Sequence, residues 1–403
     1  MPVLNLALAF MATAAFVSAV AARVRVPYTV ALVVVGLAAG ALGVARSVTI
    51  RPDTVVIVLI LPLLFEGAIR IPRAHLRTYA PLILALAVPG TLVSAGVIAA
   101  GAILGGIPWH SAMLLGAIAS SIDPAGVIAL VRQARLDLRF GTVIEGEAVI
   151  NDAVAIVLFS LAAAPPPAPV AGAGVIAGFV WLLGGGAAVG GLAGAAVAYA
   201  LSGVTEPAVE ALGSLVAAAA AYVAAEAVRA SGVIGVVAAG LAFAALAGRS
   251  LTGGGRETVR VVWDVIAFLA NSALFLLVGV LVPLSLLTRH AALIAIVVLA
   301  ALVARALGVY VFAGALARPN APVPVAWRHA LVWTGLRGGV AVALVLALPP
   351  MLPQRDGVAA AILGLVVWTL IGQGLLVEPV MRWTGLRTSR ALGTPAAHGA
   401  RSP

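Results

Sequence analysis

Three carboxylates and an amide stand together in one apolar stretch of the chain, as Glu145, Glu147, Asn151 and Asp152 within residues 143–159. The rest of the stretch is apolar enough to span a lipid bilayer. An acidic side chain at bilayer depth costs roughly 2.5–3.5 kcal/mol, and it is usually retained because it faces protein or water and binds or moves something. The stretch therefore indicates movement of ions or protons across a membrane.

Other ionisable residues fall at the same depth as Asp152 in other apolar stretches. Glu66, Asp123 and Arg337 each lie about twelve residues into a predicted span, and Arg305 lies about fourteen residues into another. At ~1.5 Å per residue these positions reach roughly 18 Å, near the middle of a ~30 Å hydrocarbon core. Five such groups at one level predict a single site rather than scattered polar defects.

Two of the spans are predicted to be interrupted in the middle. Pro124 follows Asp123, and proline removes a backbone donor and disfavours helix in the residue before it. Three glycines surround Arg337 within residues 334–339. Interrupted segments in corresponding positions of two halves indicate the ion site of a transporter. The two positions predict that the halves of the chain are inverted repeats.

Asp152 is the candidate carrier of both a proton and a cation, because burial penalises the charged carboxylate and favours binding of either. The alternative is a core carboxylate that is hydrogen-bonded to helix ends. Asp123 is interpreted as a cap of the half-helices, where its charge balances the positive helix ends, with or without a part in the ion site. Asn151 is interpreted as a packing amide or as part of the site, and it leaves the site one negative charge short of a pair of aspartates.

The remaining acids have other predicted roles. Glu147 is interpreted as structural, because it lies about 140° around the helix from Asp152. It needs a buried partner, and Arg305 and Arg337 are available. Glu66 is either a cation ligand or a hydrogen-bonded structural acid, and Glu145 is interpreted as a funnel or cap residue nearer the cytoplasmic end.

The elements that hold these residues are predicted to be transmembrane helices. Of the 403 residues, 63% are hydrophobic and 9% are charged, against about 25% charged in soluble proteins. The absence of cysteine excludes disulfides and thiolate metal sites. The fold class is therefore an all-α polytopic membrane protein. Spans of about 20 apolar residues are predicted near residues 3–22, 27–45, 54–70, 79–104, 111–131, 140–164, 171–201, 207–228, 232–248, 259–284, 291–316, 325–349 and 357–380.

The net charge of +10 comes from arginines, and the chain has no lysine. The arginines concentrate in short loops after odd-numbered spans and in the tail, residues 381–403, so they are interpreted as determinants of topology and not as a nucleic-acid surface. Residues 1–380 are predicted to be one transmembrane unit in the lipid of the plasma membrane. The N-terminus is predicted to lie outside, and the short basic tail in the cytoplasm.

Four stretches, read in order, resemble the monovalent cation/proton antiporter-1 family, the sodium/proton exchangers. They are residues 61–66 (LPLLFE), 121–124 (SIDP), 144–153 (IEGEAVINDA) and 335–344 (GLRGGVAVAL). The resemblance covers nearly all of the predicted spans. It implies a cation/proton antiporter without a cofactor, and it implies a homodimer that works by an elevator-type movement.

The same resemblance implies a division of the chain and crossed, discontinuous fifth and twelfth helices. It places the core domain at about residues 79–164 and 291–380, and the dimerisation domain at about residues 1–70 and 171–284.

The resemblance also implies roles for single residues. Asp152 matches the residue that binds the ion and the proton, and the pair Asn151–Asp152 resembles the branch that exchanges one cation for one proton. Asp123 matches the acid at the crossing, so Asp152 and Asp123 are the candidate ligands of a monovalent cation. Glu66 matches a secondary acid of the site. Glu147 and Arg305 match a stabilising ion pair, and Arg337 matches the arginine of the second broken span.

Two positions depart from the family pattern. Ile122 stands where the family usually has threonine, and Ala148 stands where it usually has serine. The backbone carbonyl of Ile122 remains a candidate ligand, but Na⁺ loses at least one side-chain oxygen. The departures predict weak binding of Na⁺, or selectivity for K⁺ or another cation, with water or the hydroxyls of Ser120 and Ser121 as the alternative source of oxygen.

Two other classes of protein compete with the antiporter. A passive cation channel on the same scaffold should show a selectivity ring or a repeated filter, and the sequence shows neither. An intramembrane aspartyl enzyme would need two aspartates held together, and Asp123 and Asp152 are the candidates. The two arginines at the same depth and the lack of a Gly-x-Gly-Asp motif argue against an enzyme.

Overall fold

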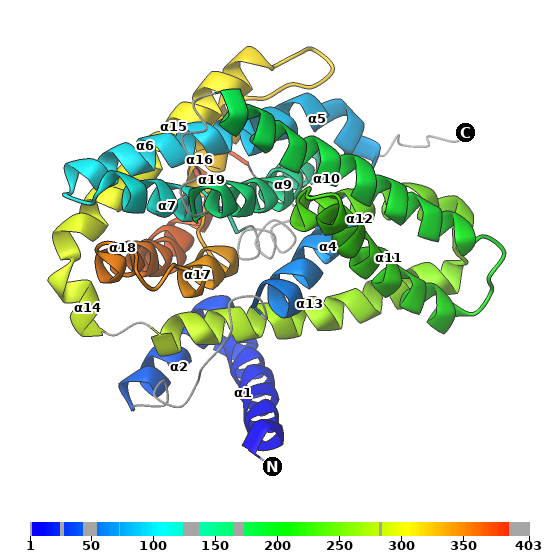
Figure 1. Ribbon diagram of the computed structural model, residues 1–403, viewed down its shortest axis with the longest axis horizontal. Helices are drawn as coiled ribbons and strands as arrows, with labels where there is room; N and C mark the ends of the chain where they lie inside the picture. The colour runs from blue at the N-terminus through cyan, green and yellow to red at the C-terminus, as the bar shows by residue number, and fades with distance from the viewer. Residues whose placement is uncertain are drawn as a thin grey trace, which may run out of the picture.

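The described part of the chain is built from helices (Figure 1). The computed structural model describes residues 2–24, 28–42, 55–71, 73–123, 137–163, 173–281 and 284–386. The first helices are α1 (Pro2–Val24), α2 (Tyr28–Ala41), the π-helix η2 (Val56–Ile60), α4 (Leu61–Arg70), α5 (Arg73–Ala87), α6 (Pro89–Leu104), α7 (Trp109–Ala119), α9 (Leu138–Ala163) and α10 (Ala173–Ala200). They are followed by α11 (Pro207–Ala227), α12 (Gly232–Ser250), α13 (Gly253–Leu281), α14 (Leu284–Arg289), α15 (Ala291–Ala315), α16 (Val325–Trp333), α17 (Gly339–Leu346), α18 (Arg355–Val367), the π-helix η3 (Trp368–Gln373) and α19 (Gly374–Trp383).

Many of these helices have the length and composition of membrane spans. Within the described ranges, eight helical segments are long and apolar enough to cross a bilayer. The protein is therefore a multi-pass membrane protein, as the composition predicts. Helix occupies at least part of each of the thirteen predicted ranges. The number of actual crossings, thirteen, stays a prediction.

The longest of these segments, His75–Leu104, joins α5 and α6. The α-helical run is interrupted at Val88, directly before Pro89. Proline has no backbone N–H and clashes with the preceding turn, which accounts for the interruption. The interruption lies three residues before Thr91, whose hydroxyl contacts Asn151.

Small residues let several helices approach closely. On α10, a Cβ atom added to Gly190 or Gly194 would collide with the backbone of Gly235 or Ala239 on α12. Such small-residue contacts are typical of helices that associate in membranes. The helices α10, α11 and α12 therefore pack side by side, and α13 contacts α11, α2 and α4 (Figure 1).

Helix α9, which carries Glu147, Asn151 and Asp152, lies at the centre of the molecule. It contacts α4, α5, α7, α10, α12 and α17, and most of its side chains are buried. By contrast, α10 is largely exposed and apolar, as expected of a helix that faces lipid. The division into core and dimerisation domains stays a prediction. The proline-rich segment 165–169 and most of the tail lie outside the described residues.

Candidate ion-binding site

Two interrupted helices meet beside α9. Helix α7 ends at Ala119, and the chain continues without helix to Asp123. Residues 334–338 separate α16 from α17, which confirms the predicted break of the twelfth span. The backbone N–H of Asp123 donates a hydrogen bond to the carbonyl of Leu336 at 2.8 Å, so the two breaks touch. The continuation of the fifth span, from Pro124, lies outside the described residues.

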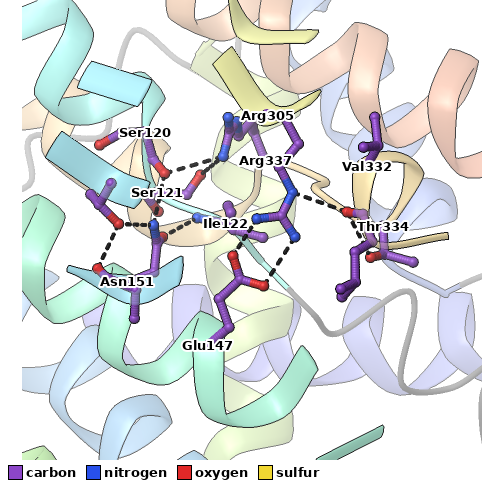
Figure 2. Close-up of polar contacts among 12 residues, drawn as sticks. Ser120, Ser121, Ile122, Glu147, Asn151, Arg305, Val332, Thr334 and Arg337 are labelled. Carbon is purple, nitrogen blue, oxygen red and sulfur yellow. Dashed lines mark hydrogen bonds and ion pairs between the residues drawn. The ribbon is translucent and has the colours of Figure 1, made fainter. Parts of the chain in front are cut away.

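Opposite charges cap the helix ends at this contact. The Arg337 guanidinium donates through Nη1 to the carbonyls of Ser120 (3.1 Å) and Ser121 (2.9 Å), at the negative C-terminal end of α7 (Figure 2). The Asp123 carboxylate accepts from the backbone N–H of Gly339 at 3.3 Å, at the positive N-terminal end of α17. Each charge therefore stabilises the end of a half-helix that it complements.

Asn151 joins α9 to the first break. Its Oδ1 accepts from the backbone N–H of Ile122 at 2.8 Å, and its Nδ2 donates to the Ser120 carbonyl at 3.1 Å and to the Thr91 hydroxyl (Figure 2). Both amide hydrogens are therefore used within the protein. Thr91 in turn donates to the Ala87 carbonyl at 2.7 Å. The sequence analysis missed Thr91, although a hydroxyl in an apolar span beside a proline was a signal for it.

Asp152 follows Asn151 on α9 and is also buried. One of its oxygens, Oδ1, accepts a hydrogen bond from the Ser121 hydroxyl at 2.6 Å. Ser121 is the residue before Ile122, so a hydroxyl reaches the carboxylate although Ile122 and Ala148 offer none. The carboxylate also lines a cavity, and its hydrogen bond from Ser121 ties it to the first break.

Glu147 and Arg305 form a buried pair that joins α9 to α15. The guanidinium contacts both carboxylate oxygens, through Nη1 to Oε1 and through Nη2 to Oε2 at 3.0 Å. The Arg305 Nε also donates to the carbonyl of Leu331 on α16 at 3.0 Å (Figure 2). Of the two arginines that the sequence offers to Glu147, the structure therefore pairs Arg305 with it, and Arg337 caps the C-terminal end of α7.

A cavity of about 280 Å³ brings several of the predicted acids together. Its lining includes Glu66, Asp123, Glu145 and Asp152, from α4, α9 and the first break. The sequence analysis missed two further lining residues, Arg70 and Asp264. Arg70 forms ion pairs with Glu66, one turn earlier on α4, and with Asp264 on α13. Ile122 contributes its N–H to Asn151, and its carbonyl as an ion ligand stays a prediction.

The π-helix η3, near the end of the described chain, contacts the second break. The π-helix η3 presents Thr369, whose hydroxyl lies 3.1 Å from the backbone nitrogen of Arg337, and Gln373, which donates to the Trp333 carbonyl at 2.9 Å. Gln373 therefore caps the C-terminal end of α16. Single-turn π segments often lie at functional sites because they re-aim side chains. Two polar residues in an apolar final span were the signal that sequence analysis passed over.

Gly338, in the second break, lies against the side chain of Asp123 in the first. A Cβ atom at this position would collide with the Asp123 side chain. We expect Gly338→Ala to displace the Asp123 carboxylate from the N–H of Gly339 and to reduce both the thermal stability and the transport rate. Gly254→Ala, in the first turn of α13 where the nearest atom to an added Cβ is 3.6 Å away, is the control. Wild-type melting and transport of Gly338→Ala would show that the close approach is unimportant.

Known proteins resemble this chain in sequence and in fold. The family described as sodium/hydrogen exchanger, transmembrane, matches residues 9–383. The Na(+)/H(+) antiporter ApNhaP of Aphanothece halophytica is 34% identical over 375 residues, which cover 91% of this chain and 71% of the relative. The Na(+)/H(+) antiporter NhaG of Bacillus atrophaeus is 31% identical over 391 residues, which cover 93% of this chain and 73% of the relative. The fold is similar to that of the sodium proton antiporter MjNhaP1 from Methanocaldococcus jannaschii, with a TM-score of 0.76 and 19% identity over 95% of this chain and 97% of that one.

Proposed function

Because this chain belongs to the sodium/hydrogen exchanger family, we propose that it exchanges a monovalent cation for protons, with Asp152 binding each in turn. The protein is a membrane transporter and not an enzyme, and it needs no cofactor. The observation that carries the proposal is the Asp152 carboxylate, which is buried at two interrupted helices and lies at a cavity. An empty, charged carboxylate is costly at this depth, whereas a bound proton or cation neutralises it. Movement of the site is therefore favoured only when Asp152 is loaded, which couples the two fluxes.

The proposed stoichiometry is one cation for one proton. The neighbour of Asp152 is the neutral Asn151, whose amide hydrogens are held by Ser120 and Thr91. Asp123 accepts from the N-terminal end of α17, and Arg337 holds the C-terminal end of α7. Asp152 is therefore proposed as the single group whose charge changes during the cycle.

The proposed movement is an elevator. The residues around Asp152 belong to the proposed core domain, residues 79–164 and 291–380. The opposite side of the cavity comes from α2, α4 and α13, which belong to the proposed dimerisation domain, residues 1–70 and 171–284. A core that slides along this wall would expose Asp152 to each side in turn. The proposed assembly is a homodimer in the plasma membrane, with the N-terminus outside and the C-terminus in the cytoplasm.

The test is transport by proteoliposomes that contain a pH-sensitive dye. Addition of external Na⁺, Li⁺ or K⁺ is expected to raise the internal pH, because the cation enters as protons leave. With Na⁺ as the driving ion, clamping the membrane potential at zero is expected to leave the rate unchanged if the exchange is electroneutral. Liposomes without protein are the control. A lack of proton movement with every cation would overturn the proposal.

The choice of cation is proposed to depend on the missing hydroxyl at position 148. Ala148 is buried and lies four residues before Asp152, on the same face of α9. We expect Ala148→Ser to supply an oxygen to Na⁺ and to lower the Na⁺ concentration for half-maximal transport several-fold, with a smaller effect on K⁺. Ala153→Ser, which adds the same hydroxyl on another face of α9, is the control. Equal apparent affinities in wild type and Ala148→Ser would contradict this account.

A further inference from the structure

Arg70 is a fixed cation inside the candidate transport cavity. Its side chain contacts two lining carboxylates, Glu66 on its own helix and Asp264 on α13. The carboxylate of Asp152 lines the same cavity from α9. A guanidinium stays charged at every physiological pH, and its planar donors suit carboxylates. The side of the cavity opposite Asp152 therefore carries a guanidinium that stays ionised and is covalently part of the protein.

Arg70 is intermediate in exposure among the charged residues that line the cavity. The exposed fraction of the side chain falls from 41% at Asp264 to 25% at Arg70 and 13% at Glu66. Asp152 is 8% exposed. Asp264 and Arg70 are therefore the more exposed charged residues of the lining, and an opening on their side places the guanidinium near the path of a cation to Asp152. In the proposed orientation the opening faces the cytoplasm.

We propose that Arg70 acts as a tethered counter-cation that competes with the transported cation for the carboxylates of the cavity. This inference rests on the proposed exchange function. In this state Arg70 forms ion pairs with Glu66 and Asp264, so these two carboxylates bind a transported cation only weakly. The positive charge also weakens binding at Asp152, which lowers the apparent affinity and speeds release on this side. Arg70 is thus an affinity-setting residue rather than a part of the structural ion pair between Glu147 and Arg305.

The first experiment measures cation affinity after removal of this charge. For Arg70→Gln we expect the half-saturating cation concentration to fall by roughly tenfold, because removal of a unit positive charge from the cavity strengthens the attraction of its carboxylates for a cation. Arg70→Lys keeps the charge and should remain within about twofold of wild type. Arg249→Gln removes the same charge from an exposed position in the last turn of α12, and it should not change the affinity.

Neutralising both members of the Arg70–Asp264 pair separates electrostatics from packing. Asp264→Asn removes one negative charge from the cavity lining and should raise the half-saturating cation concentration. Arg70→Gln combined with Asp264→Asn restores the net charge of the cavity, so its affinity should return towards wild type. A purely structural role of the ion pair predicts the opposite, because the double variant would then be as impaired as either single variant.

Affinity is read in two ways, by transport in proteoliposomes and by cation-dependent thermal stabilisation of the purified protein. An unchanged affinity in Arg70→Gln, or a value for Arg70→Lys that equals that of Arg70→Gln, would overturn the role of Arg70 while leaving exchange intact. Failure of the exchange proposal would look different, since the wild type would then move no protons with any cation. If Arg70→Gln does not fold, Asp264→Asn alone decides, because an unchanged or lowered half-saturating concentration contradicts the competition.

Discussion

Asp152→Asn is expected to abolish cation-driven proton movement and to leave the protein folded. The amide has nearly the same shape as the carboxylate, and its oxygen can still accept the hydrogen bond that Ser121 donates to Oδ1. It can, however, neither take up a proton nor neutralise a cation. The measurement is the internal pH of proteoliposomes after addition of each cation, together with the melting temperature of the purified variant.

Glu145→Gln is the matched control for this prediction. Glu145 lies on the same helix, about two turns before Asp152, and lines the same cavity. We expect this variant to retain exchange, with at most a shifted apparent affinity. Cation binding, followed as thermal stabilisation by Na⁺, should be lost in Asp152→Asn and kept in Glu145→Gln. Wild-type transport by Asp152→Asn would remove Asp152 from the role of carrier.

Residue types and depth predicted that the charged residues of the two broken spans meet. An isolated charge in an apolar span must find a partner, so acids and arginines at one level indicated contacts between distant helices. The structure indeed brings Asp123 to α17 and Arg337 to the end of α7. The break of the twelfth span followed from the glycines around Arg337, because a mid-span run of glycines is a poor helix.

The pairing of Arg70 with Asp264 could not be predicted from residue type and depth. Arg70 stands at the end of a span, where an arginine is explained equally well by topology. Its partner Asp264 lies 194 residues further along the chain, and only the packing of α4 against α13 brings the two together. Thr91 likewise follows the interruption before Pro89, and Thr369 and Gln373 lie on the π-helix η3. Hydroxyl and amide groups cost little at bilayer depth compared with charges, so their positions carry a weaker signal.

The buried pair of Glu147 and Arg305 predicts the largest change in stability. Removing one partner leaves the other charge buried and unpaired, which costs about 3–5 kcal/mol. We therefore expect Glu147→Gln and Arg305→Met each to lower the melting temperature strongly and to reduce the yield of folded protein. The measurement is thermal denaturation of the detergent-solubilised protein, followed by gel filtration.

The double variant Glu147→Leu with Arg305→Met shows why the pair is needed. It leaves no buried charge, and apolar residues of similar volume often replace a buried ion pair at little or no loss in stability. The Leu331 carbonyl loses the Arg305 Nε but keeps the Thr334 hydroxyl, which lies 3.2 Å away. We therefore expect the double variant to melt above both single variants. A double variant that melts at or below the less stable single variant would contradict this account. The contacts of the ion pair would then hold α9, α15 and α16 in place, beyond neutralising each other's charge.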